Sequence, residues 1–308
     1  MIPETLLGQP FVLGHTFNGL YFAALLFFAS VGLTLVFGIL NLLNMAHAAF
    51  YGLGAYVAVW TLNNIGDITT TMAALLFVLV FVIPIVVFVL AAALDKTVFA
   101  PLYEIEPVYQ LLATFGVILM LDDIIKYLWG ATPISVDAAT NPSRQLGTVD
   151  VLGASISTYR SFVILIAVLC VVGLYLMFVK TKIGKISQAM SEDYEMVQML
   201  GINVTRVRVL IFSLSIAIAA LGGALFVPFA VATPAVTLEY VLLSFAVIVI
   251  GGLGSLKGVV VASLIIGMVR SFGIAYVPAI ELAIVFALMV VVIIVRPEGL
   301  FGDEGVVE

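Results

Sequence analysis

The chain has 308 residues, of which 64% are hydrophobic and only 10% are charged, and its formal net charge is −6. Soluble domains are about half apolar and about a quarter charged, so this composition excludes an ordinary soluble protein. A nucleic-acid ligand is also excluded, because such ligands need a basic face. Several apolar runs approach the ~20 residues that a membrane-crossing helix needs, and the alternation typical of membrane strands is absent. We therefore expect an all-α, polytopic membrane protein.

The first apolar run, from about Phe17 to Leu40, leads into an uncharged polar stretch with flanking glycines. This pattern predicts a helix that is broken or bent within the membrane, and such breaks are tolerated where they line a cavity. The candidates for a substrate pathway are therefore Asn41, Asn44, His47 and Tyr51. The same polar groups could instead serve only to support the broken helix backbone.

A second helix is expected to end near Leu62, before a turn over residues 63–67. Further spans are predicted at about residues 71–94, with a kink at Pro84, and at 108–129, 159–179 and 209–231. Three shorter passes follow at about 240–250, 259–271 and 279–295. The total is eight or nine transmembrane helices. A second glycine-rich sequence, GGLGSLKG, separates the first two short passes, which is a weak indication of an inverted repeat of broken helices.

Two connections organise the predicted topology of what we expect to be one membrane domain, residues 1–308. Residues 180–208 contain five of the twelve Lys and Arg residues, which places this segment in the cytoplasm by the positive-inside rule. Counting crossings from it places a loop over residues 95–106 and the C-terminus in the cytoplasm as well. Residues 130–158 are rich in turn formers and poor in Lys and Arg, so they are expected to form the largest loop outside, in the periplasm.

The basic segment is predicted to contain a short amphipathic helix from Ser191 to Leu200. Ser191 is a suitable N-cap, acidic residues in the first turn favour the helix dipole, and Gly201 is a suitable stop. Such a helix can lie on lipid headgroups or fit a groove on a partner protein. Its candidate contact residues are Ser191, Glu192, Asp193, Glu195, Val197, Leu200 and Gly201.

Charged residues also gather toward the predicted outer ends of the spans: Asp122, Asp123, Lys126, Glu239, Arg270 and Glu281. Each alone is an ordinary interfacial charge, and Asp122 can pair with Lys126 at i,i+4. Together they are candidates for a rim on which a soluble protein docks by complementary charge.

Signs of catalysis are missing from the sequence. The glycine-rich stretch Gly252–Gly258 lacks the Gly-Lys-Ser/Thr ending of a phosphate-binding loop, so we expect no ATP site in this chain. His15 and His47 have no companions for a metal site, and Cys170 is expected to be a core residue. The chain is therefore predicted to be neither an enzyme nor a cofactor-binding protein.

A resemblance gives these features a context. EMVQMLG, from Glu195 to Gly201, has the Glu and Gly spacing of the coupling motif of ABC importer permeases, without that motif's two alanines. SEDYEMVQMLGINVTRVR, GLTLVFGILNLLNMAHAAFYGLGAYVA and VIGGLGSLKGVVVASLIIG resemble successive blocks of the LivH-type branched-chain amino acid permeases. This chain departs from the usual family residues at Ala48, at Lys257 and in the acidic YEIEP.

The resemblance implies an ABC importer permease fold in a bacterial inner membrane. It also implies three kinds of partner: a second, LivM-like permease, two cytoplasmic ATPases that bind the ATP, and a periplasmic binding protein. The expected substrates are branched-chain or other hydrophobic amino acids, while urea, short amides and aromatic acids remain alternatives. An ion-coupled secondary transporter is a further alternative, although it usually needs acidic ion sites in mid-membrane, where this chain offers neutral Asn and His.

Overall fold

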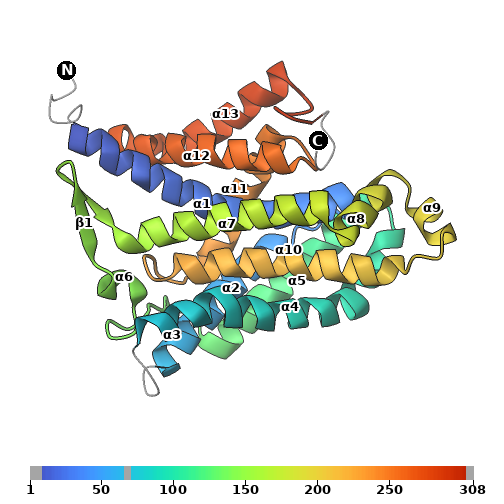
Figure 1. The fold of residues 1–308 in the computed structure, drawn as a ribbon, viewed down its shortest axis with the longest axis horizontal. Helices are drawn as coiled ribbons and strands as arrows, with labels where there is room; N and C mark the ends of the chain where they lie inside the picture. The colour runs from blue at the N-terminus through green and yellow to red at the C-terminus, as the bar shows by residue number, and fades with distance from the viewer. Residues whose placement is uncertain (1–8, 66–70, 303–308) are drawn as a thin grey trace.

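Two helices form the centre of the bundle. The computed structural model describes residues 9–65 and 71–302, and Figure 1 shows its long helices packed side by side. In their most apolar windows, 83% of α1 (Gln9–Leu40) and 78% of α10 (Val204–Phe226) is buried. The corresponding share is 22% for α7 (Thr158–Lys180) and 6% for the helical stretch Pro278–Val295. The outer helices therefore present apolar side chains outward, as helices in contact with lipid do.

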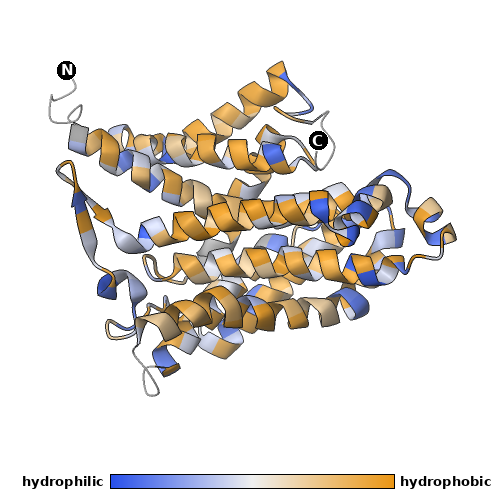
Figure 2. Cartoon of the chain, in the orientation of Figure 1, coloured by the Kyte–Doolittle hydropathy of each residue, from blue (hydrophilic) through white to orange (hydrophobic). Residues whose placement is uncertain are grey.

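The all-α membrane fold is confirmed, but the count of eight or nine crossings is not. Seven helices in the described ranges are long and apolar enough to cross a membrane. Two further helices, α2 (His47–Ile65) after the break and α11 (Pro234–Gly251) before the glycine-rich turn, are not among these seven. In Figure 2 the apolar colouring covers the middle of the bundle, while hydrophilic residues gather toward its two ends.

The third predicted span is longer than expected and its helix type changes along the way. It runs through α3 (Met72–Phe77), the π-helix η2 (Val78–Val82), α4 (Ile83–Leu94), the π-helix η3 (Asp95–Phe99) and the 3₁₀-helix η4 (Ala100–Glu104). Pro84 cannot donate a backbone hydrogen bond, and the wider π turn before it, in which the Ile83 N–H bonds to the Val78 carbonyl, accommodates it. The prediction of a loop over residues 95–106 is therefore wrong for residues 95–104, which continue the helix.

The other helices match the predicted spans with shifted ends. α5 (Pro107–Trp129) and α7 begin within one residue of the prediction, and α12 (Leu256–Tyr276) and α13 (Glu281–Val295) follow, joined by the 3₁₀-helix η5 (Pro278–Ile280). α10 and α11 both begin earlier than expected. The turn predicted over residues 63–67 is wrong for residues 63–65, which are helical, and Gly66 and Asp67 lie outside the described residues.

The connection between α5 and α7 carries secondary structure that the sequence did not indicate. Its elements are α6 (Pro142–Gln145), β1 (Thr148–Val151) and β2 (Ala154–Ser157). The two strands pair antiparallel, with Thr148 opposite Ser157. Positive φ angles of 52° at Leu152 and 81° at Gly153 make the tight turn between them. This hairpin lies at one end of the bundle, and α8 (Lys182–Glu192) and α9 (Tyr194–Met199) lie at the other (Figure 1).

Candidate functional site

The break after α1 is real, and Asn41 has a conformational role in it. Asn41 has a φ angle of 50°, and its backbone N–H bonds to the Phe37 carbonyl at 3.0 Å. Asparagine tolerates this left-handed conformation, which ends a helix. The side chain is exposed, so the structure does not bring Asn41 together with the other three pathway candidates.

The backbone of the break is satisfied by two α5 residues that sequence reasoning missed. The Leu43 N–H donates to Gln110 Oε1, and the Met45 N–H donates to Thr114 Oγ1, both at 3.1 Å. Gln110 and Thr114 are buried. Their i,i+4 spacing on an apolar helix was an available signal, since two polar groups on one buried face need partners.

Asn44, His47 and Tyr51 lie together in the protein interior, with at most 1% of their surface exposed. Neither polar atom of the Asn44 side chain has a hydrogen-bond partner in the described ranges, and the same holds for both His47 ring nitrogens. A Cβ added at Gly32 of α1 would lie 2.3 Å from His47 Cε1, so this glycine makes room for the imidazole. Buried polar groups of this kind are normally paired, so these are candidates for contact with a polar solute.

Tyr51 forms the wall of this polar cluster toward α10 and α11. Its ring stacks on that of Tyr240, with centroids 4.3 Å apart. A Cβ at Gly223 would lie only 1.9 Å from the Tyr51 carbonyl oxygen, so α2 and α10 approach closely because this residue is glycine.

The two glycine-rich breaks meet in space. A Cβ built on Gly38, near the end of α1, would lie 2.8 Å from the Cα of Gly254, in the turn between α11 and α12. Gly252 and Gly254 have φ angles of 103° and 86°, which glycine adopts readily. The contact places both irregular segments at one site, whether or not they descend from a repeat.

The basic segment contains two helices where one was expected. α8 ends at Glu192, and α9 begins at Tyr194 after an Asp193 N-cap, whose Oδ1 accepts the Met196 N–H at 2.8 Å. The prediction that Ser191 caps a helix is wrong, because Ser191 is still in α8 and its hydroxyl donates to the Gln188 carbonyl. Gly201 has a φ angle of 77°, as its predicted stop position requires.

One side of α9 anchors it and the other is exposed. Val197 is buried in a small core with Met190 and Val204, and Leu40 at the end of α1 packs against that core. Met196, Met199 and Leu200 are 55%, 80% and 71% exposed. Glu192, Asp193 and Glu195 are exposed as well. The i, i+3, i+4 spacing of Met196, Met199 and Leu200 puts these apolar side chains on one face of the helix. Figure 1 shows α9 projecting beyond the ends of α7 and α10.

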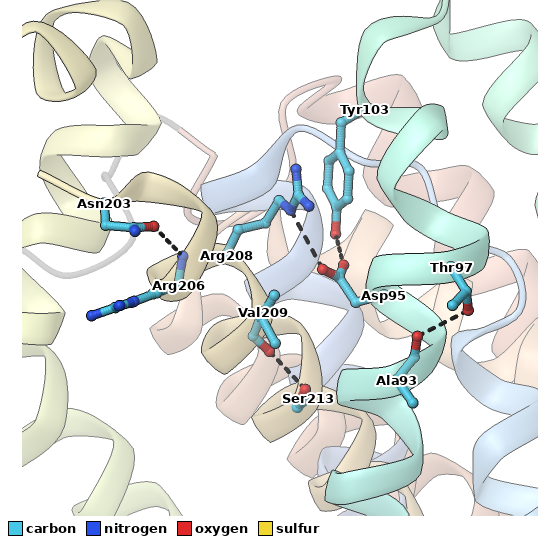
Figure 3. A network of polar contacts seen from close by, with 9 residues as sticks. All are labelled: Ala93, Asp95, Thr97, Tyr103, Asn203, Arg206, Arg208, Val209 and Ser213. Atoms are coloured by element: carbon cyan, nitrogen blue, oxygen red, sulfur yellow. Dashed lines mark hydrogen bonds and ion pairs between the residues drawn. The ribbon is translucent and has the colours of Figure 1, made fainter.

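A buried ion pair joins α10 to the long third span next to this segment, and the sequence did not reveal it. Asp95 is fully buried, and its Oδ2 lies 3.4 Å from Nε of Arg208. Tyr103 donates its hydroxyl to Asp95 Oδ1 at 2.8 Å, and the Arg208 guanidinium lies 4.5 Å from the Tyr103 ring centroid. Figure 3 shows Asp95 between these two partners, while Arg206 points away from them.

The predicted docking rim divides into two groups. On α5, Lys126 pairs with Asp122 and lies 3.8 Å from Asp123. Between α11 and α12, Arg270 pairs with Glu239 at 2.6 Å. Glu281, at the start of α13, has one buried carboxylate oxygen without a partner among the described residues. Across the same ranges, no cluster of three His, Cys, Asp or Glu side chains could hold a metal ion.

A bundle of apolar helices with a polar cluster buried at a helix break has the architecture of a membrane transport protein. Residues 15–295 match the family model described as "Branched-chain amino acid transport system / permease component". The chain therefore belongs to this permease family.

Named relatives agree over nearly the full length. The chain is 26% identical to the high-affinity branched-chain amino acid transport system permease protein LivH of Salmonella typhimurium, over 95% of this chain and 96% of the relative. It is 23% identical to the corresponding protein BraD of Pseudomonas aeruginosa, over 92% and 94%. It is 27% identical to a probable LivH of Methanocaldococcus jannaschii, over 82% and 78%. No solved structure matches the chain significantly.

Proposed function

We propose that this chain is the transmembrane permease subunit of a binding-protein-dependent, ATP-driven importer in a bacterial inner membrane. The observation that carries the proposal is α9, a capped helix that projects from the bundle with three exposed apolar side chains on one face. Helix-in-groove recognition uses such faces, and an ATPase is the partner that an ABC permease needs at this position. The printed names of the relatives support branched-chain or other hydrophobic amino acids as the substrates.

The proposed assembly has four kinds of component. This chain forms one permease domain over residues 1–308 and pairs with a second, LivM-like permease. Residues 180–208 face the cytoplasm, and their helix α9 docks in a groove of one of the two ATPases that bind the ATP. The C-terminus also faces the cytoplasm. Residues 130–158 face the periplasm. There the binding protein docks on the charged groups of α5 and of α11, α12 and α13.

The contacts of α9 suggest how its movement reaches the pathway. Its anchoring core includes Leu40, the last residue of α1 before the break. The break leads within a few residues to Asn44 and His47, which we propose line the pathway. The Asp95–Arg208 pair ties the start of α10 to the third span, so that the helices next to α9 move together. ATP-driven closure of the ATPases would then bias one element between two positions.

The test uses the complete transporter in proteoliposomes, with ATP-dependent uptake and ATP hydrolysis measured for leucine, urea, short amides and aromatic acids. Met199→Glu is expected to abolish uptake and stimulated ATP hydrolysis while the permease stays folded, because it places a charge on the apolar contact face. Lys185→Glu is the matched control, since it adds negative charge at an exposed position of α8. Uptake that persists without the ATPases would instead indicate a secondary transporter.

Two further measurements test the other assignments. Asn44→Ala is expected to reduce transport with assembly of the complex intact; if assembly falls instead, Asn44 only supports the break. Neutralising Glu239 and Arg270 together is expected to weaken stimulation by the binding protein, and normal import by that variant would exclude them from the docking rim.

A further inference from the structure

A cavity with polar and apolar lining residues lies at the end of the bundle opposite α9. It has a volume of about 190 Å³ and lies between α1, α7 and α12. α1 lines it with His15, Asn18, Tyr21 and Phe22, α7 with Arg160, and α12 with Ser271. Arg160 is the third residue of α7, which starts beside the β1–β2 hairpin (Figure 1). The proposed orientation places this end outside.

Arg160 brings a positive charge to the cavity without a carboxylate to balance it. Its guanidinium donates to Asn18 Oδ1 and lies 4.5 Å from the Phe229 ring centroid and 5.5 Å from that of Tyr21. No ion pair of Arg160 occurs within residues 9–65 and 71–302, and none of the described side chains around the cavity is acidic. By contrast, nearby Arg270 is paired with Glu239 at 2.6 Å.

Two hydrogen-bond donors of the cavity residues are unused. Nε of Arg160 is buried without a hydrogen-bond partner in the described chain, and so is the hydroxyl of Tyr21. The Tyr21 side chain is 4% exposed, so solvent does not readily replace the missing partner. Buried donors and an unbalanced cation together favour an anionic acceptor, and the planar guanidinium can bind the two oxygens of a carboxylate with two parallel hydrogen bonds.

The rest of the cavity suits the remainder of an apolar amino acid. The aromatic rings of Phe22 and Tyr21 provide an apolar wall for a hydrocarbon side chain. Asn18 Oδ1 accepts one hydrogen bond from Arg160, and an amide oxygen has a second lone pair that can accept from an ammonium group.

We propose that Arg160, with Tyr21, binds the α-carboxylate of the transported amino acid at a site where the substrate enters from the outside. The inference rests on the proposed function, and it narrows the substrate class. Zwitterionic amino acids fit this site, whereas urea and neutral amides lack the carboxylate that the guanidinium needs.

The test measures binding of labelled leucine to the complete permease–ATPase complex in nanodiscs, without binding protein, in competition with unlabelled leucine or leucinamide. The wild type is expected to prefer leucine about tenfold or more, the ratio that one charge-assisted hydrogen bond gives. Arg160→Gln should bring this ratio close to one, and Arg160→Lys should restore part of it. Arg144→Gln, at an exposed arginine in the connection that precedes α7, is the control and should keep the preference.

Three results would overturn the proposal: a wild type without preference for leucine, an Arg160→Gln variant that keeps the preference, or one that loses affinity for both ligands equally. The last result would mean that Arg160 only ties α7 to α1. Failure of the proposed function is distinguishable, because uptake without ATPases would refute ATP-driven import while leaving the leucine-to-leucinamide ratio intact.

Discussion

Replacing Arg208 by methionine should destabilise the end of the bundle that carries α9. Asp95 is fully buried, and without Arg208 its one hydrogen-bond donor among the described side chains is the Tyr103 hydroxyl. Removing one member of a buried ion pair costs about 3–5 kcal/mol. The remaining hydrogen bond offsets part of the loss, so we expect a decrease in the free energy of unfolding of about 3 kcal/mol, the lower end of that range.

Two further variants separate the charge from the hydrogen bond. The double variant Asp95→Leu with Arg208→Met removes both charges together, so it should be at least about 2 kcal/mol more stable than Arg208→Met alone. Tyr103→Phe keeps the ion pair and the aromatic ring but removes one hydrogen bond to a charged group, for an expected loss of about 1.5 kcal/mol.

Chemical denaturation of the purified permease in detergent micelles, followed by circular dichroism, measures these differences as shifts in the transition midpoint. Arg206→Met is the matched control, because Arg206 is an exposed arginine on the same helix and points away from the pair (Figure 3). Its effect should stay within about 0.5 kcal/mol. The reasoning is refuted if Arg208→Met is no more destabilising than Arg206→Met, or if the double variant is as unstable as the sum of its single changes.

Three other predictions follow from the local geometry. Gln110→Leu leaves a backbone N–H of the break without its acceptor, which should lower the free energy of unfolding by about 1–3 kcal/mol in the same assay. Asp193→Ala should weaken α9 by about 1 kcal/mol through loss of its cap, seen as faster amide exchange in α9, whereas Ser191→Ala should have no such effect. Gly54→Ala places a methyl group 2.3 Å from an α10 carbonyl oxygen and should cost about 1–3 kcal/mol of stability. Gly116→Ala is the control, because no neighbouring atom lies within 4 Å of a Cβ built at Gly116. A loss of stability for Gly116→Ala as large as that for Gly54→Ala would contradict the packing argument.

The candidate site shows which inferences a local pattern can support. The uncharged polar stretch after Leu40 predicted a break, and the structure has one between α1 and α2. Local pattern did not distinguish the roles within it, because Asn41 faces outward while Asn44 and His47 are buried. The sequence predicted Ser191 as the N-cap of this helix, whereas the N-cap of α9 is Asp193. Both residue types are good N-caps, and only the position at which α8 ends decides between them.

By itself, the sequence determined the class of protein, its helical membrane fold and its permease family. Composition and the length of apolar runs decide the class and the fold, because lipid leaves helices as the only way to satisfy the backbone of such runs. The family is indicated by the resemblance of the sequence blocks around Asn44, Glu195 and Gly252, and the match of residues 15–295 to the family model shows it. The tertiary structure alone decided the partners of the polar groups. Gln110 satisfies a backbone group 67 residues away, and Arg160 contacts an asparagine 142 residues away. Such contacts depend on how the helices pack. Local spacing can show that Gln110 needs a partner, but it does not show which residue supplies that partner.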